Sequence, residues 1–166
     1  MEKLDWEKII EEILGRIQVS ENYFKRKGAA SEIHNKIIEA IRNEWTKRRR
    51  PSIEERAFKI DFVGRTFDRY GKVELAVEVD TWWKRYRSWV KLLDINAEKK
   101  KIWIYVCKDM EKSEDYFIRA LRSFRELAEL RKEDVTNNVT IFMKVAGKEG
   151  VKKAHLWEKE GEAKVL

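Results

Sequence analysis

The sequence has very little of several residues, and each scarcity excludes a class of structure. Cys107 is the only cysteine among 166 residues, so no disulfide forms within the chain. Because it ends an apolar run, 102–107, we expect its thiol to be buried and unreactive. No run of eighteen apolar residues occurs, which excludes a membrane-spanning helix, and no membrane partner is expected. The N-terminus lacks the basic-then-apolar pattern of a secretory signal, so we expect a cytoplasmic protein.

Other shortages limit the chemistry. His34 and His155 are the only histidines, and neither has a metal-ligand partner at the spacing of a zinc site. The glycine-containing segments 63–65 and 147–150 lack the remainder of any nucleotide-binding fingerprint. No Ser-His-Asp arrangement can be argued. The sequence therefore gives no support to a zinc site, a phosphate loop or a serine hydrolase.

Charged residues are abundant, at 40% of the chain, and are mostly Lys, Arg and Glu. This composition is typical of proteins from heat-loving organisms. Lysine and arginine outnumber the acids, which gives a net charge of +7. A basic excess favours an anionic partner such as the phosphate backbone of a nucleic acid.

Hydrophobic spacing predicts an α/β chain. Helices are expected over residues 4–17, 31–47, 85–99 and 113–131. Strands are expected over residues 57–67, 73–80, 101–107 and 139–145, with an edge strand at 152–158. Ser31 is the expected N-cap of the second helix, and Pro51 prevents that helix from continuing. This order predicts a sandwich of helices on a mixed sheet.

We expect a single domain over residues 1–166. Its core, residues 31–107, bears the candidate site. An N-terminal helix and loop occupy residues 1–30, and a C-terminal helix with strands occupies residues 108–166.

Three carboxylates alternate with aliphatic residues on two neighbouring strands. Asp61 lies in the first, and Glu78 and Asp80 lie in the second. Because strand side chains alternate between faces, these acids share one face. If the turn pairs residue 69 with residue 72, Asp61 lies opposite Asp80, whereas a register one pair shorter places it opposite Glu78. Clustered carboxylate oxygens suit Mg²⁺ or Mn²⁺.

A simpler interpretation of these acids stays open. They can pair with Lys59, Arg65 or Lys72, as on any highly charged surface. Glu74 shares the face of Glu78 but lies near the turn, and we expect it to be exposed to solvent.

The order of the expected elements resembles the PD-(D/E)XK nuclease superfamily. A helix bearing Glu32 comes first, followed by a hairpin that carries Asp61 and then Glu78-Val79-Asp80, and after it a helix and an apolar strand. The resemblance covers residues 31–107. It implies the restriction-endonuclease-like fold, a three-layer α/β sandwich with a central mixed sheet flanked by helices. It also implies that Asp61, Glu78 and Asp80 bind Mg²⁺ or Mn²⁺, with Glu32 as an auxiliary acid. The implied activity is hydrolysis of DNA phosphodiester bonds, as an endonuclease or an exonuclease.

One position departs from the family pattern, because Asp80 stands where the family has a lysine. In some members a lysine on a nearby helix or strand takes this role. The candidates here are Lys91, Lys84 and Lys59. We favour Lys91, because the helix that carries it should begin beside the acids.

Aromatic and basic residues interleave directly after the acidic strand, in the segment 81–89. Such a segment can stack on bases while it contacts phosphates. The expected nucleic-acid-binding residues are Trp82, Trp83, Lys84, Arg85, Arg87, Arg48, Arg49 and Arg50. The last three can equally be a solvated helix end favoured by the helix dipole. Tyr86 and Trp89 fit the inward helical stripe and are expected in the core.

Two alternatives to the nuclease remain at this stage. A catalytically inactive nucleic-acid-binding module of the same fold would use the aromatic and basic segment alone. A structural or partner-binding protein would have no role with nucleic acid. Whether the chain forms a homodimer is left open.

Overall fold

The computed structural model of the chain describes residues 4–48, 53–55, 59–65, 72–158 and 164–165. The helices are α1 (Trp6–Arg16), the short 3₁₀ helix η1 (Tyr23–Lys25), α2 (Ala29–Arg48), α3 (Tyr86–Asp94) and α4 (Ser113–Leu130). The strands are β1 (Ile53–Glu55), β2 (Phe62–Arg65), β3 (Val73–Asp80), β4 (Lys100–Cys107), β5 (Thr140–Val145), β6 (Val151–His155) and β7 (Lys164–Val165).

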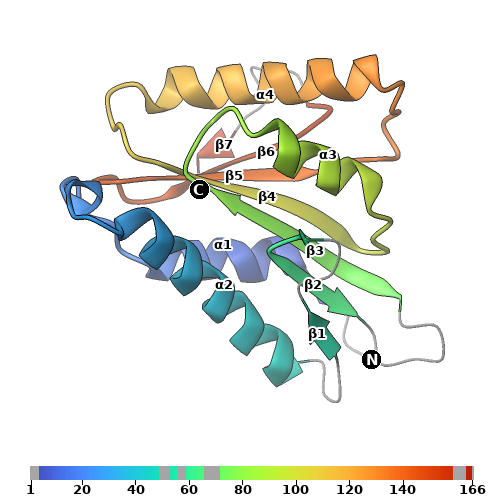
Figure 1. The fold of residues 1–166 in the computed structure, drawn as a ribbon, viewed down its shortest axis with the longest axis horizontal. Helices are drawn as coiled ribbons and strands as arrows, with labels where there is room; N and C mark the ends of the chain where they lie inside the picture. Colours follow the sequence, from blue (N-terminus) through green and yellow to red (C-terminus); the bar gives the residue numbers. More distant parts are fainter. Residues whose placement is uncertain (1–3, 49–52, 56–58, 66–71, 159–163, 166) are drawn as a thin grey trace.

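These strands form one mixed sheet in which the spatial order follows the chain order, from β1 to β7. The pairs β3–β4 and β4–β5 are parallel, because α3 and α4 supply the crossovers between them. The other neighbouring pairs are antiparallel. Figure 1 shows α3 and α4 on one side of the sheet and α1 and α2 on the other. The expected α/β architecture, with helices on both sides of a mixed sheet, is therefore confirmed.

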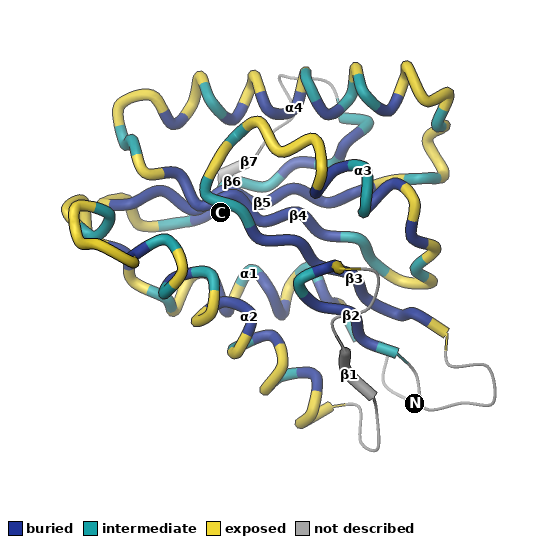
Figure 2. Tube along the Cα trace, in the orientation of Figure 1, coloured by how far each residue is buried: buried dark blue, intermediate teal, exposed yellow. Residues whose placement is uncertain are grey.

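Two hydrophobic cores lie on the two faces of the sheet, and β4 contributes to both. Its residues Ile102, Ile104 and Val106 pack with α1 and α2. The alternate residues, Trp103 and Tyr105 among them, pack with α3 and α4. Figure 2 shows the central strands buried along most of their length. A strand covered on both faces favours apolar side chains at successive positions, which explains the continuous apolar run that the sequence shows.

Strand β3 has the bounds that the sequence predicts, but its side chains are more deeply buried than expected. Leu75, Val77 and Val79 face α1 and α2. Glu74 and Glu78 lie on the opposite face, and both are buried, with exposed fractions of 3% and 2%. The expectation that Glu74 is exposed is wrong, because β3 lies inside the sheet between β2 and β4.

Helix ends account for two further differences. Helix α2 begins at Ala29 rather than after Ser31, because Gly28 takes a left-handed φ of 81° and its carbonyl already accepts from the Glu32 N–H. Helix α3 ends at Asp94, five residues earlier than expected, where Ile95 turns extended and buries its side chain.

The outer strands differ more from the expectation. The first predicted strand, 57–67, is represented by β2, and its positions 57–58 and 66–67 lie outside the described residues. Strand β1 was not predicted from the sequence. The strand expected at the edge near 152–158 is β6, and it is interior, because β7 pairs with it. Among the residues that the structure describes, no helix combines the length and the apolar character needed to cross a bilayer.

Candidate active site

The register of the β2–β3 pair brings two of the predicted acids together. Phe62 lies opposite Val77, which places Asp61, one residue before β2, beside Glu78. This is the shorter of the two registers that the sequence allowed. Paired residues of antiparallel strands point to the same face, so the two carboxyl groups are neighbours.

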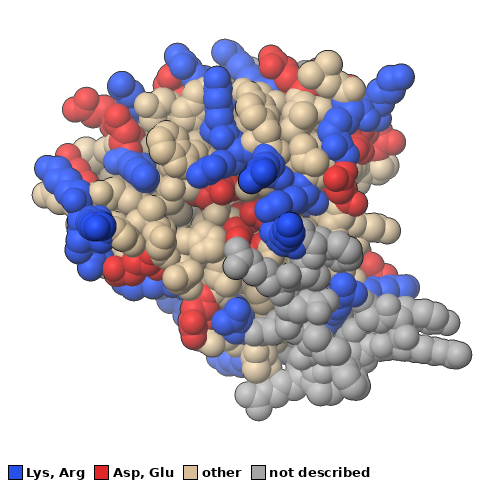
Figure 3. Space-filling model, viewed as in Figure 1, with Lys and Arg blue, Asp and Glu red and all other residues tan. Residues whose placement is uncertain are grey.

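An open hollow of about 520 Å³ lies where these carboxyl groups meet. Its walls come from the start of α2, the end of β3 and the first turns of α3. The polar and charged residues that line it are Ser31, His34, Asn35, Asp61, Glu78, Asp80, Thr81, Arg85, Arg87, Ser88 and Lys91. Figure 3 shows acidic side chains near the centre of this face of the molecule, with lysines and arginines around them.

Asp61 is held in its ionised form by two donors. Its Oδ2 accepts a 2.8 Å hydrogen bond from the Val79 N–H and lies 3.1 Å from His34 Nε2. Burial alone would raise the pKa of Asp61, but the hydrogen bonds from His34 and Val79 outweigh it, so the pKa is lowered. The same contact raises the pKa of His34, because the imidazolium gains a carboxylate partner.

Glu78 has the opposite character. Burial raises its pKa to about 8, and the Asp61 carboxylate, through its charge and a hydrogen bond, adds to the shift. Ser88 Oγ donates to Glu78 Oε2 at 3.3 Å, and Lys91 Nζ lies 3.5 Å from Oε1. Oε1 is buried and receives no hydrogen bond from any described donor. Asp61 and Glu78 therefore share one proton near neutral pH.

Asp80, the third predicted acid, lies in the same hollow but is tied to different partners. Its Oδ2 accepts a 2.9 Å hydrogen bond from Trp103 Nε1, and its Oδ1 lies 3.7 Å from Arg85 Nε. Burial raises the pKa of Asp80, although hydrogen bonds from Ser88 and Trp103 act against the shift. The Arg85 side chain is about half exposed, so this ion pair is a weak restraint.

Among the three candidate lysines, Lys91 is the one that reaches the acids. Besides its ion pair with Glu78, its ammonium donates a 2.9 Å hydrogen bond to the backbone carbonyl of Lys59. Lys59 has a left-handed φ of 59°, a conformation uncommon for residues other than glycine. This backbone therefore contributes to the site, whereas the Lys84 ammonium lies 4.8 Å from the centre of the Trp83 ring.

Helix α2 supplies a different residue from the one that the sequence suggested. Glu32 does not line the hollow; it pairs with Arg26 at 2.5 Å and with Lys36 at 3.4 Å. His34, two residues later, contacts Asp61 instead. Nothing in the sequence indicated a zinc ligand at His34, and its contact with a carboxylate was not predicted. Its place beside the buried stripe residues Ile33 and Ile37 is the signal that could have found it.

The aromatic and basic segment divides into surface and core. Trp82 is 58% exposed, whereas Trp83 is partly buried. Trp89 is fully buried as expected, but Tyr86 is 50% exposed, so its assignment to the core is wrong. Tyr86 opens α3 and meets the Trp89 ring edge-on from outside.

The predicted arginines are also divided. Arg85 and Arg87 line the acid hollow. Arg48 pairs with Glu44 at 3.1 Å within α2, the solvated helix end that the sequence left open. Arg49 and Arg50 lie outside the described residues.

The chemical type of these side chains suits a divalent cation, but the side chains are not arranged as a complete set of metal ligands. Carboxylate oxygens suit Mg²⁺ and Mn²⁺, and Glu78 Oε1 is a buried oxygen that lies 3.5 Å from the Lys91 ammonium but accepts no hydrogen bond from a described donor. Within the described residues, no group of three or more His, Cys, Asp or Glu side chains is arranged to hold a metal ion. Both oxygens of Asp80 already have partners, Trp103 Nε1 for Oδ2 and, more weakly, Arg85 for Oδ1.

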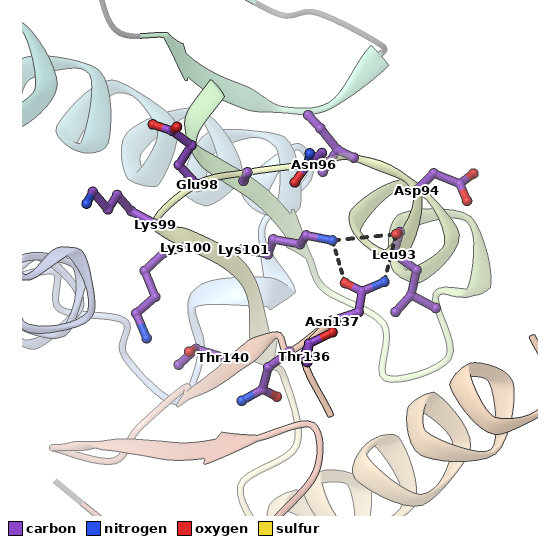
Figure 4. A pocket seen from close by; sticks show the side chains of 13 residues that line it. Leu93, Asp94, Asn96, Glu98, Lys99, Lys100, Lys101, Thr136, Asn137 and Thr140 are labelled. Atoms are coloured by element: carbon purple, nitrogen blue, oxygen red, sulfur yellow. Dashed lines mark hydrogen bonds between the residues drawn. The ribbon is translucent and has the colours of Figure 1, made fainter. Parts of the chain in front are cut away.

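A second hollow, of about 430 Å³, lies at the opposite ends of β4 and β5 (Figure 4). Burial lowers the pKa of Lys101 there to about 8, and its ammonium contacts Asn137 Oδ1 at 2.5 Å and the Leu93 carbonyl at 3.5 Å. Figure 4 shows Lys99 and Lys100 pointing away from Lys101. These contacts hold the end of α3 against the sheet, and the charged groups do not converge on a ligand.

Comparison of the chain with protein-family models, with curated proteins and with solved structures finds no match.

Proposed function

We propose that this chain is a metal-dependent nuclease-like protein that hydrolyses DNA phosphodiester bonds. One observation carries the proposal. A pair of carboxyl groups on adjacent strands, Asp61 and Glu78, lies in an open hollow, and the Lys91 ammonium is held 3.5 Å from the second of them. Carboxylates that bind a divalent cation, together with a fixed ammonium, would supply the positive charge that stabilises the negative charge developing on a phosphate.

The order of the elements supports the resemblance to the PD-(D/E)XK superfamily. Asp61 directly precedes β2, β3 carries Glu78, helix α3 follows, and the apolar β4 pairs in parallel with β3. In the proposal, Lys91 on α3 replaces the lysine that the family has at position 80. Asp61, Glu78 and Asp80 are the proposed ligands of Mg²⁺ or Mn²⁺.

A bound divalent cation would neutralise phosphate charge and lower the pKa of a coordinated water. The residues of the chain would contribute to metal and phosphate binding in distinct ways. His34 and the Val79 N–H keep Asp61 ionised, and the backbone of Lys59 fixes the Lys91 ammonium beside Glu78. Arg85 and Arg87 place further positive charge along the hollow for the backbone of the substrate.

The test is a cleavage assay with Mg²⁺ or Mn²⁺ on single-stranded, duplex and branched DNA. Asp61→Asn, Glu78→Gln and Lys91→Met should each lower cleavage by at least about a hundredfold. Glu98→Gln is the matched control, because Glu98 is an exposed acid that pairs with Lys72 outside the hollow. Cleavage that survives both acid substitutions would reject the proposal.

A second candidate function has its own supporting observation. Asp61, Glu78 and Asp80 each contact positively charged or donor groups of the protein, and the described residues form no ready metal cage. This favours a catalytically inactive nucleic-acid-binding module of the same fold. It predicts salt-sensitive DNA binding with no cleavage in either metal. Titration calorimetry with Mn²⁺ separates the two functions. Only the nuclease requires Mn²⁺ binding that Asp61→Asn abolishes.

A further inference from the structure

A small aromatic hollow, of about 190 Å³, adjoins the acid hollow. Thr81, which follows Asp80 directly, lines both of them. The remaining residues of the aromatic hollow are Trp82, Trp83, Tyr105, Lys108, Asp109 and Tyr116. Four of its seven lining residues are therefore aromatic, and Thr81 joins this hollow to the proposed metal ligand Asp80.

The two tryptophans play different parts in this hollow. Trp83 is a fixed wall, because its ring stacks on Tyr116 with a centroid distance of 5.9 Å and an interplanar angle of 14°. Trp82 is 58% exposed, whereas tryptophan side chains are on average highly buried. The indole of Trp82 thus presents aromatic surface to solvent at the rim of the hollow.

Positive charge surrounds these rings. The Lys108 ammonium lies 5.4 Å from the centre of the Trp82 ring and 5.3 Å from that of Phe24. On Trp83, the Lys84 ammonium and the Arg119 guanidinium lie 4.8 Å and 6.0 Å from the ring centre. Exposed aromatic faces with interspersed cations suit a strand whose bases stack while its phosphates are neutralised. This positive charge favours a polyanionic partner over an apolar partner or one with few acidic groups.

We propose that this hollow holds one unpaired base of a single-stranded DNA segment, with Trp82 as its stacking platform. The adjoining phosphodiester bond then lies over the acid hollow. A base in a duplex is already stacked and paired, so it enters such a hollow only after leaving the helix. This inference rests on the proposed function and specifies its substrate as single-stranded DNA or a duplex with an unpaired end.

The test measures binding and cleavage separately. In EDTA, fluorescence anisotropy would compare a labelled single strand with a blunt duplex of the same length. The single strand should bind at least about tenfold more tightly. Trp82→Ala should weaken single-strand binding about 5- to 150-fold, whereas Trp82→Phe, which keeps a ring, should retain most of it. Lys108→Met should lower the slope of binding against salt by roughly 0.7, the change expected for one phosphate contact.

Matched controls come from other surfaces. Leu130 is 82% exposed at the end of α4, so Leu130→Ala removes exposed apolar surface outside both hollows. Lys8→Met removes an exposed cation of α1. Both should leave binding unchanged, and a thermal melt of Trp82→Ala should match that of the unaltered protein.

The outcomes separate this inference from the proposed function. Single-strand binding that depends on Trp82 but is accompanied by no cleavage in any metal would reject the nuclease and keep the base-binding hollow. Equal affinity of Trp82→Ala and the unaltered protein for the single strand would overturn the hollow, whatever the cleavage result. Absence of DNA binding would overturn it in favour of a protein partner.

Discussion

Asp61 and Glu78 lie beside each other across the β2–β3 pair, and their pKa values are displaced in opposite directions. His34 and the Val79 N–H stabilise the charge of Asp61, whereas burial and that same charge oppose ionisation of Glu78. The pair therefore holds one proton over a wide pH range. Two predictions follow from this proton, one about the stability of the fold and one about metal binding.

Glu78→Gln should change the pH dependence of stability. The pKa of Glu78 in the folded chain, about 8, lies above its ordinary value of 4.5. Protonation therefore favours folding; the contribution is complete below about pH 4.5 and is lost as pH rises through about 8. Glutamine stays uncharged, so the variant should gain on the order of 2–4 kcal/mol relative to the unaltered protein between about pH 5 and pH 9. Urea unfolding in EDTA measures this, and parallel pH profiles for the two proteins would contradict it.

Divalent metal should stabilise the protein more strongly as pH rises. A carboxyl group must lose its proton before it binds a metal, and Glu78 does so near pH 8. We expect Mn²⁺ to raise the melting temperature more at about pH 8.5 than at about pH 6. Asp61→Asn should remove this stabilisation, whereas Glu98→Gln should keep it. A metal effect of equal size at both pH values, or one that survives Asp61→Asn, would show that Mn²⁺ binds elsewhere.

The sequence predicted the acids of this site better than their partners. Alternation on β3 placed Glu78 and Asp80 on one face, and the hairpin register then required Asp61 nearby. The contact between Lys91 and Glu78 also agrees with the favoured lysine. By contrast, Glu32 and His34 are two residues apart on one helix, and which of them meets Asp61 depends on how α2 is rotated against the sheet. Local periodicity does not fix that rotation.

Gly64 and Trp45 form a close contact between β2 and α2 that gives a third prediction. A Cβ added to Gly64 would lie 2.5 to 2.7 Å from three ring carbons of Trp45. That ring is fully buried and stacks on Trp6 with centroids 5.2 Å apart, so it has little room to move. Gly64→Ala should cost about 1–3 kcal/mol of stability, or more.

Chemical unfolding would measure this cost against a matched control. Gly15 lies in α1 with no atom within 4 Å of an added Cβ, so Gly15→Ala should stabilise by roughly 0.5–1 kcal/mol. Trp45→Leu replaces the opposing ring with a smaller side chain, so it should reduce the loss of stability caused by Gly64→Ala. A Gly64→Ala protein as stable as the unaltered chain would show that β2 shifts freely against α2.

Elements with strong periodicity were predicted well, and those set by long-range pairing were not. Strand β3 has the bounds that its apolar alternation predicts, and β4 and α4 differ by one residue at one end. Strand β1 has three residues and exists through its pairing with β2, so its own sequence carries little signal. Strand β6 is interior only because β7, which follows a stretch outside the described residues, pairs with it.

Glu7 is a further case in which distant residues meet, and sequence alone gave no sign of it. From the first turn of α1, its Oε1 contacts His155 Nε2 at 2.8 Å and Lys153 Nζ at 3.2 Å, and its Oε2 contacts Lys100 Nζ at 2.6 Å. The hydrogen bond from His155 holds the pKa of Glu7 well below its usual range, against the effect of burial. One carboxylate therefore joins α1 to β4 and β6.

Glu7→Gln should destabilise the fold by about 2–4 kcal/mol, because it leaves three cationic or ionisable groups around a neutral side chain that is only 13% exposed in the native chain. The contribution of Glu7 is present above its ordinary pKa of 4.5 and is lost as pH falls through its lowered value. The contribution of His155, whose pKa is raised, is present below 6.5 and is lost as pH rises through the raised value. The loss caused by Glu7→Gln should therefore be largest in the weakly acidic range between these limits.

Urea unfolding across that range measures the loss, with Asp115→Asn as the control, because Asp115 pairs with Arg119 on an exposed face of α4. Equal losses for the two variants would mean that the Glu7 carboxylate adds no more than a surface ion pair.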